Sequence, residues 1–206
     1  MFVMTLDQRG SRSGTDLVPQ TLELLERILV GDMTPVAAFE RTAGDEIQGV
    51  VADPKAVYAV VRMLLRDAAW YIGIGHGSID QPIPVRAAEG GGSAYWVARD
   101  AVNLAKTKRA STPIAFVSHT HGELASDLNG LLQLLGFVLV ERSAAAWQAI
   151  DLITTSYGTP NGVTQKLAAQ TLGITPAAMS ARLSNAGLNQ ELEAQPVFLK
   201  MLALLS

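Results

Sequence analysis

Two aspartates that are far apart in the sequence are the side chains best suited to chemistry. Asp7 closes an apolar run at the N-terminus, and Asp45 lies in the segment Thr42-Ala43-Gly44-Asp45-Glu46 between two strand-like segments. If these strands pair, the two carboxylates meet at one edge of a sheet. Mg²⁺ is usually held by one or two protein carboxylates together with the phosphates of its substrate. The pattern therefore predicts a Mg²⁺ or Mn²⁺ site that handles the phosphates of a nucleotide.

The segment that follows Asp7 has the composition of a phosphate-binding loop. Its sequence, Gln8-Arg9-Gly10-Ser11-Arg12-Ser13-Gly14, combines flexible backbone N–H groups with two arginines. Both kinds of donor suit phosphate oxygens. We expect nucleotide contacts from Arg9, Gly10, Ser11 and Arg12, and from Gly44, which permits the tight acidic turn. Glu46 is expected to face solvent rather than to be a third metal ligand.

The overall composition describes an ordinary globular chain of 206 residues, with 49% hydrophobic and 17% charged residues. A net charge of −3 argues against coating nucleic acid through bulk charge, so any DNA contact must be local. No cysteine is present, which excludes thiolate metal sites and disulfides. Residues 131–140 form the longest apolar stretch, about half of the roughly 20 residues a membrane span needs. We expect a cytoplasmic protein without a membrane partner.

Hydrophobic periodicity in the first part of the chain predicts an α/β (α+β) fold. Helices should begin near Asp16 and Asp53, each followed closely by a proline and an apolar stripe. The predicted strands are residues 2–6, 36–41, 47–52, 70–75 and 113–118. The order strand, helix, strand, strand, helix, strand is that of a ferredoxin-like sheet with packed helices.

The remaining segments predict a loop and an all-helical C-terminal unit. Residues 81–92 contain two prolines and three consecutive glycines, so they should form a mobile loop able to close over a site. A helix over residues 93–106 follows. Further helices are expected at residues 123–138, 142–155, 163–171, 176–186 and 196–205. We therefore divide the chain into a palm-like domain, residues 1–120, and a helical domain, residues 121–206.

Residues 163–188 match the pattern of a helix-turn-helix. Leu167, Ala168 and Leu172 would form the inner face of its first helix, and Gly173 allows the turn. Thr175 would cap the second helix, whose inner face would carry Met179 and Leu183.

The DNA-binding capacity of this motif is limited by its charge. The residues we expect to contact DNA are Gln165, Lys166, Thr175, Ser180, Arg182 and Asn185. Only two of them are basic, and phosphate neutralisation supplies most non-specific affinity. A homodimer presenting two such helices is therefore expected to be needed for DNA binding. A packing or oligomerisation role for the same helices is the alternative.

Four segments together, in this order, resemble the SatD family. They are Asp7 with Gly10-Ser11-Arg12, the acidic turn at Asp45, the strand Tyr71-Ile72-Gly73-Ile74-Gly75-His76-Gly77, and Ala94-Tyr95-Trp96-Val97-Ala98-Arg99. Residues 1–118 also resemble, more distantly, the palm of class III nucleotidyl cyclases and of diguanylate cyclases.

The palm resemblance implies roles for particular residues. Asp7 and Asp45 match the two metal-binding aspartates of cyclase palms. A cyclase also stabilises the charge of its transition state from a late helix. Arg99 and Asn103 are the matching residues here, in two registers that exclude each other. The implied ligands are a nucleoside triphosphate or a cyclic nucleotide.

Three functions are consistent with these features. The first is a cytoplasmic transcriptional regulator that binds a nucleotide through a metal ion in its palm and binds DNA as a homodimer. The second is an active nucleotidyl cyclase or a related phosphoryl-transfer enzyme that uses the same carboxylates. The third is a non-catalytic protein-interaction module, which would bind neither nucleotide nor DNA.

Overall fold

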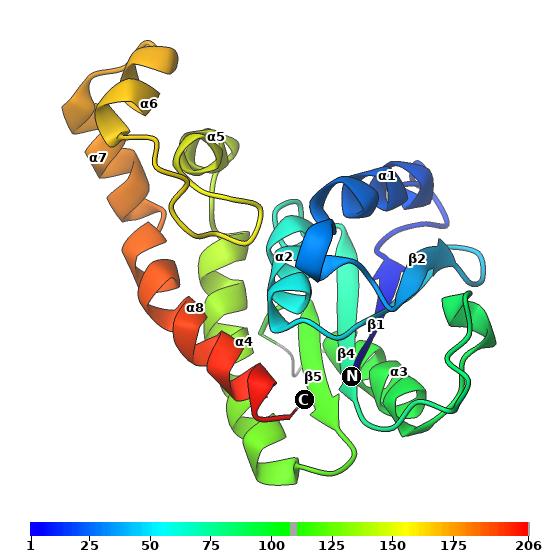
Figure 1. The fold of residues 1–206 in the computed structure, drawn as a ribbon. Coiled ribbons are helices and arrows are strands. Elements are labelled where there is room, and N and C mark those ends of the chain that lie inside the picture. Colours follow the sequence, from blue (N-terminus) through cyan, green and yellow to red (C-terminus); the bar gives the residue numbers. More distant parts are fainter. Residues whose placement is uncertain (108–110, 206) are drawn as a thin grey trace.

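The computed structural model describes residues 1–107 and 111–205, and it is a mixed α/β fold with a helical C-terminal part (Figure 1). Its strands are β1 (Phe2–Gln8), β2 (Ala37–Arg41), β3 (Glu46–Val51), β4 (Trp70–His76) and β5 (Ile114–Ser118). The helices among them are α1 (Val18–Ile28), α2 (Pro54–Leu64) and α3 (Ser93–Ala105), with short 3₁₀ turns η1 (Gly31–Met33) and η2 (Ala87–Glu89). The predicted fold class is confirmed.

The five strands form one sheet in the order β2-β3-β1-β4-β5. β1 lies between β3 and β4 and is antiparallel to both, whereas β5 is parallel to β4. The order of the first four strands is that of a ferredoxin-like fold, and β5 extends its edge. In this register Asp7 lies opposite Glu46 on one side and opposite Tyr71 on the other.

Alternate residues of β1 face opposite layers, as the strand period of two requires. Phe2, Met4 and Leu6 belong to the main core, which includes residues of α1, α2 and the C-terminal helices. Val3 belongs to a smaller cluster with Ala98 and other residues of α3. The sheet therefore separates α3 from the main core, and α3 packs on the face that carries Asp7.

The helix starts follow the predicted chemistry. Asp53 is the N-cap of α2, and its Oδ1 accepts a hydrogen bond of 2.7 Å from the backbone N–H of Lys55. Leu17, rather than Asp16, is the N-cap of α1. Asp16 still contributes to this helix start, since its Oδ1 accepts a hydrogen bond from the N–H of Val18 at 3.1 Å.

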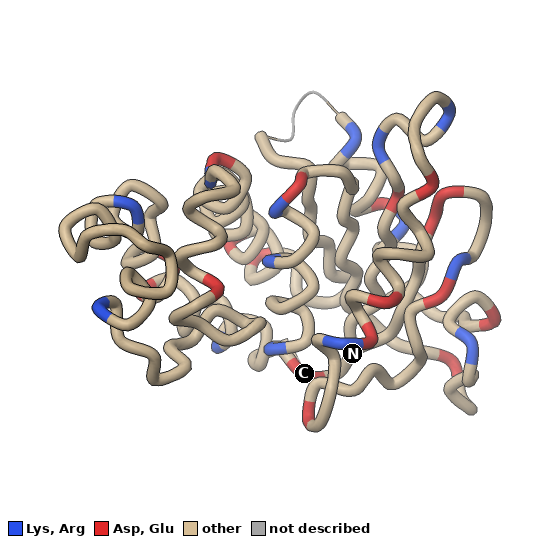
Figure 2. The backbone as a smooth tube through the Cα atoms, turned by 90° about the horizontal axis from the view of Figure 1, so that it is seen from above, with Lys and Arg blue, Asp and Glu red and all other residues tan. Residues whose placement is uncertain are grey.

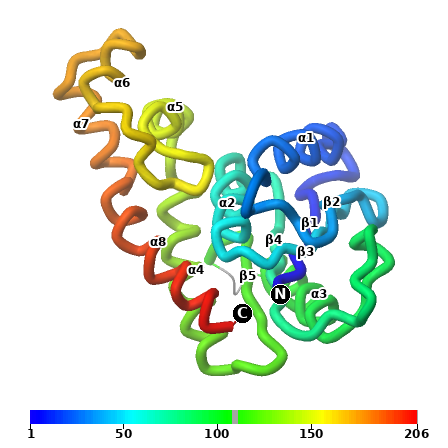
Figure 3. Tube along the Cα trace, in the orientation of Figure 1, coloured from blue at the N-terminus to red at the C-terminus, as the bar shows by residue number. Residues whose placement is uncertain are grey.

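The C-terminal part consists of α4 (Gly122–Val140), α5 (Ala144–Ile153), α6 (Gln165–Thr171), α7 (Pro176–Asn185) and α8 (Leu188–Ala203). Figure 3 shows α8 running alongside α4, against which it packs. The prediction of a helix that begins at residue 196 is wrong, because Pro196 lies inside α8. The cost of this proline is offset by the buried side chains of α8, which are Leu188, Glu191, Gln195, Phe198 and Leu202.

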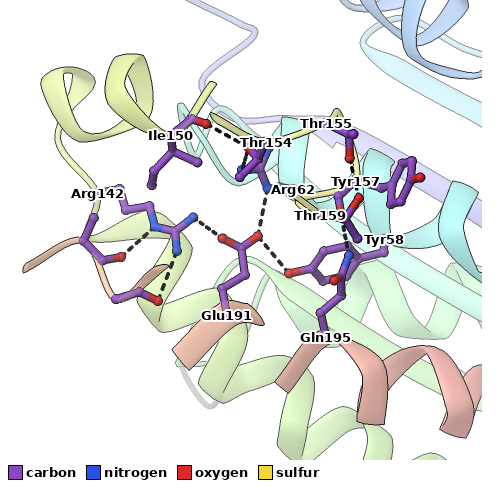
Figure 4. A network of polar contacts seen from close by, with 12 residues as sticks. Tyr58, Arg62, Arg142, Ile150, Thr154, Thr155, Tyr157, Thr159, Glu191 and Gln195 are labelled. Atoms are coloured by element: carbon purple, nitrogen blue, oxygen red, sulfur yellow. Dashed lines mark hydrogen bonds and ion pairs between the residues drawn. The ribbon is translucent and has the colours of Figure 1, made fainter. Parts of the chain in front are cut away.

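A buried polar network joins the helical part to the palm (Figure 4). The carboxylate of Glu191 on α8 is 1% exposed and pairs with two arginines, Arg62 Nε of α2 at 2.8 Å and Arg142 Nη1 at 2.7 Å. The hydroxyl of Tyr58 donates a third hydrogen bond, 3.0 Å long, to the same carboxylate. Burial and the charge of Glu191 raise the pKa of Tyr58. The two parts of the chain are therefore held together by specific polar contacts as well as by apolar packing.

In the described part of the chain, α4 is the one helix long and apolar enough to cross a membrane, with a mean hydropathy of 1.3. Its Leu128, Leu132 and Leu135 are buried, and the helix packs against β5 and α8. One such helix, identified by length and composition alone, is weak evidence for a membrane span.

Candidate functional site

The end of β1, the loop that follows it and the turn between β2 and β3 surround an open cleft of about 920 Å³. Asp7 enters it from β1 and Asp45 from the turn. The backbone N–H of Gln8 donates to the carbonyl of Asp45 at 3.2 Å, so the turn is tied directly to the strand. The other lining residues are Gln8, Arg9, Gly10, Ser11, Arg12, Ser13, Gly14, Asp16, Arg41, Gly44, Tyr71 and Lys106. The two carboxylates predicted to meet at one edge of the sheet thus line the same cleft.

Asp7 is paired with a lysine at the end of α3, the helix packed on the same face of the sheet. Its Oδ2 lies 2.6 Å from Nζ of Lys106, the C-cap residue of α3. The Asp7 side chain is 20% exposed and the Lys106 side chain 37% exposed. A cation therefore already contacts one of the two carboxylates, at a position open to solvent.

Asp45 is held by the loop after β1. Its Oδ2 accepts a hydrogen bond from the hydroxyl of Ser11. This bond, helped by the positive charges of Lys106 and Arg12 and opposed by partial burial, lowers the pKa of the Asp45 carboxyl. Asp45 is consequently ionised at neutral pH and able to serve as a cation ligand.

The arginines of the cleft differ in how they are engaged. Arg9 lies over the ring of Tyr71, 5.1 Å from its centroid, and donates to the carbonyl of Ala68 at 2.8 Å. Arg41 pairs with Asp16 at 2.5 Å. Arg12 makes neither a hydrogen bond nor an ion pair with any residue that the structure describes. It is the cation of this wall that remains available to an anionic ligand.

Glu46 lies opposite Asp7 but is buried, so the expectation that it faces solvent is wrong. Arg99 of α3 forms a two-pronged ion pair with it, in which Nη2 is 3.0 Å from Oε1. Thr42 Oγ1 donates to Oε1 at 2.8 Å. Neither Arg99 nor Asn103 lines the cleft, and Asn103 is exposed on α3. The residue of α3 that reaches the cleft is Lys106.

No cluster of three or more acidic, histidine or cysteine side chains that could hold a metal ion occurs among residues 1–107 and 111–205. Asp7 and Asp45 offer two carboxylates in one open cleft. Mg²⁺ keeps several waters and needs no all-protein cage, so two carboxylates together with phosphate oxygens are the kind of donor set that this ion takes.

The glycine-rich loop over residues 81–92 packs elsewhere. It includes η2, and Arg86 forms an isolated bridge with Ala38 in β2. Glu40 accepts hydrogen bonds from Arg86 Nε at 3.0 Å and from the N–H of Ala88 at 2.9 Å. The loop therefore covers β2 and β3 and contributes no residue to the Asp7 and Asp45 cleft.

Helices α6 and α7 form the predicted helix-turn-helix. Thr175 caps α7 by accepting from the N–H of Ala178 at 3.1 Å, and Gly173 in the turn has a φ of 63°. Met179 and Leu183 are buried, as predicted. The inner face of α6 was predicted wrongly at one position, because Leu167 is 53% exposed and Ala169 is buried beside Ala168 instead.

The residues expected to contact DNA differ in their exposure. Gln165, Lys166, Thr175, Ser180 and Asn185 are exposed, whereas Arg182 is half-buried beside the end of α4. Figure 2 shows basic and acidic residues interspersed over the described chain, without a continuous basic stripe. The exposed basic residue among these candidates is therefore Lys166.

The fold and site define a ferredoxin-like palm, with a cleft that contains two carboxylates, joined to a helical part that bears a helix-turn-helix. The model of the SatD family matches residues 15–201. The chain therefore belongs to the SatD family. Comparison with curated proteins and with solved structures found no match.

Proposed function

We propose that the palm cleft binds the phosphates of a nucleoside triphosphate or a cyclic nucleotide through a divalent metal ion. The observation that carries the proposal is that Asp7 and Asp45 line one cleft together with an unpaired cation, Arg12. Asp7 and Asp45 would hold Mg²⁺ or Mn²⁺. The loop N–H groups at Gly10 and Ser11, with Arg9 and Arg12, would hold phosphate oxygens. Lys106 would balance the remaining negative charge.

Within this proposal the protein is a cytoplasmic regulator rather than an enzyme. A cyclase would require a cation or amide of α3 to reach the reacting phosphates. Arg99 is engaged by Glu46, and Asn103 lies outside the cleft. This arrangement supports binding over turnover, with the cyclase or phosphoryl-transfer enzyme as the alternative. A purely protein-interaction module is the third possibility, and it predicts no nucleotide binding.

Isothermal titration calorimetry with Mg·ATP and with Mg·GTP tests the proposal. We expect saturable heat for at least one nucleotide in the wild type and loss of that heat in Asp45→Asn. Glu26→Gln is the matched control, because Glu26 is an exposed acid of α1 outside the cleft. Equal heats in all three proteins would remove Asp45 from the site. If the wild type gave no heat of binding with either nucleotide, the proposal would be overturned. If chromatography after incubation showed that the nucleotide had been converted to a product, the enzyme alternative would be favoured instead.

DNA binding by a homodimer is a second candidate function, favoured by the exposed first turn of α7. Thr175 caps this turn and is exposed, Ser180 is exposed in the next turn, and Lys166 of α6 lies in the same two-helix unit. Affinity for DNA should fall steeply with salt if phosphates are contacted. Fluorescence anisotropy with mixed-sequence duplexes at 50 and at 200 mM salt, with Lys166→Ala as the variant, tests this function. Salt-independent anisotropy, or equal affinity in the variant, would exclude Lys166 as a phosphate contact.

A further inference from the structure

The last turns of α4 expose apolar side chains to solvent. Leu134 is 70% exposed and Phe137 is 59% exposed, and they lie three positions apart on one side of the helix. Gly130, one turn earlier, is also exposed, and a Cβ built there meets nothing within 4 Å. The exposed ring of Phe137 lies beside the apolar Leu134 and the small Gly130. Such a surface is suited to close contact with another protein surface.

A hollow of about 400 Å³ lies directly beside Phe137. It is enclosed by the end of α4, the start of α5 and the end of α7. Its apolar wall is formed by Val138, Ala146 and Ala186. The surface therefore presents a projecting aromatic side chain and a recess for an apolar side chain next to each other.

Two opposite charges border the same hollow. Glu141, the C-cap residue of α4, lies one turn beyond Phe137, and Arg182 lies on α7 across the hollow. Neither side chain has an ion-pair partner in the described part of the chain. An acid and a base placed on either side of a recess form a pattern that is complementary to itself after a half-turn.

We infer that this surface, formed by Leu134, Phe137, Glu141 and Arg182 around the hollow, is the contact between two copies of the chain related by a twofold axis. Phe137 of each copy enters the hollow of the other. Glu141 of each copy pairs with the partner's Arg182. Such an isologous contact closes on itself and stops at a dimer. It engages Arg182 in the dimer and brings the two α7 helices together at the interface.

A lipid surface fits this face less well. Helices that lie on membranes carry Lys and Arg beside their apolar face. The sequence of α4 contains neither residue, and its exposed positions include the acids Glu123 and Asp127. Acidic residues along the same helix repel anionic lipid headgroups, whereas Glu141 finds a basic counterpart in a second copy.

Sedimentation velocity of the full chain, over a concentration series, tests the inference. We expect the wild type to be a dimer at micromolar concentration and Phe137→Glu to weaken the dimer at least about tenfold, as expected for a central interface aromatic. Phe137 is exposed, so the variant should fold normally, which circular dichroism verifies. Trp96→Glu is the matched control, since Trp96 is 70% exposed on α3 and lies outside the proposed contact.

A charge exchange tests the pairing between copies. Glu141→Arg alone places two bases opposite each other at the interface, and Arg182→Glu alone places two acids opposite each other, so each single variant should be monomeric. When the two variants are mixed, each copy regains an opposite charge across the axis, and a heterodimer should form. An ion pair within one chain would give no heterodimer on mixing.

Three results would overturn the inference. They are a wild type that stays monomeric at tens of micromolar, a dimer unaffected by Phe137→Glu, and a mixture of the charge variants that remains monomeric. Co-sedimentation of the wild-type chain with phosphatidylcholine–phosphatidylglycerol vesicles, lost in Phe137→Glu, would assign the face to lipid instead. Nucleotide binding is not involved in these measurements, so the inference fails or holds separately from the proposed nucleotide site. A wild type that stays monomeric would also exclude DNA binding by a homodimer.

Discussion

The ammonium group of Lys106 lies 2.6 Å from a carboxylate oxygen of Asp7, which makes Lys106 a built-in competitor for any metal ion at that carboxylate. The lysine reaches Asp7 because α3 lies on the same face of the sheet. A divalent ion that binds Asp7 must displace this ammonium group or share the carboxylate with it. Metal affinity without nucleotide should therefore depend on the side chain at position 106.

Replacing Lys106 by methionine should strengthen binding of Mn²⁺ to the nucleotide-free protein. The expected gain is about two- to fivefold, because a partly exposed ion pair contributes about 1 kcal/mol or less. Electron paramagnetic resonance of free Mn²⁺ during a titration measures the affinity directly. Lys200→Met, on an exposed position of α8, is the control. Weaker Mn²⁺ binding in Lys106→Met than in the wild type would contradict the competition.

Removing the carboxylate of Glu191 should strongly destabilise the fold. Arg62 and Arg142 would both lose their buried partner, and a buried charge left unpaired costs about 3–5 kcal/mol. Both guanidinium groups also lie about 5 Å from the ring of Trp147, so the packing around this tryptophan would be disturbed. Urea denaturation of Glu191→Ala should show the loss. Glu193→Ala, an exposed position on the same helix, should change stability by less than about 0.5 kcal/mol; equal effects would refute the role of the network.

The elements with regular hydrophobic patterns could be predicted from the sequence. The start of α8 could not, because its buried face lacks such a pattern. Its buried face includes Glu191 and Gln195, two polar residues at positions where a pattern search expects apolar ones. The partners that satisfy Glu191 are remote, since Arg62 lies on α2. Only the tertiary structure shows that this polar face is buried, and the helix was therefore predicted to begin too late.

Only part of the candidate site could be predicted from the sequence, for a similar reason. That Asp7 and Asp45 share a cleft follows from local strand pairing, which sequence alternation makes visible. The pairing of Lys106 with Asp7, and of Arg99 with Glu46, depends on where α3 lies on the sheet. Sequence periodicity shows that a helix packs but not which of its residues face a given strand residue. The contributions of Tyr71 on β4 and Arg41 on β2 to the cleft were also missed.

Replacing Gly75 by alanine should destabilise the palm. A Cβ at this position of β4 would lie 2.3 Å from the backbone nitrogen of Ala98 in α3, and backbone atoms cannot move aside as a flexible side chain can. The added methyl group should push α3 away from the sheet and lower the free energy of unfolding by about 1–3 kcal/mol. Gly130→Ala is the matched control, since its Cβ meets nothing within 4 Å among the described residues and the change removes a glycine from a helix, which should stabilise by about 0.5–1 kcal/mol. The melting temperature should fall in Gly75→Ala and rise in Gly130→Ala. A shift in the same direction in both variants would contradict the close approach of α3 to β4.

His76 should make the fold less stable as the pH falls. Burial, with smaller contributions from the charges of the N-terminus and His121, lowers the pKa of His76 to about 4. Its ordinary pKa is near 6.5, so between these values the unfolded chain binds a proton that the folded chain excludes. Stability is then full above pH 6.5 and declines as the pH approaches 4. Replacement by glutamine removes this proton uptake.

The melting temperature measured from pH 7.5 to pH 4 should therefore fall less steeply in His76→Gln than in the wild type. The wild-type ring is buried beside Phe2 and lies within hydrogen-bonding distance of Ser118 Oγ at 3.0 Å, so the variant will be less stable at neutral pH. The slope with pH, rather than the absolute value, is the informative quantity. His119→Gln, at an exposed position, should retain the wild-type slope. Parallel curves for the wild type and His76→Gln would mean that the buried imidazole does not exclude the proton.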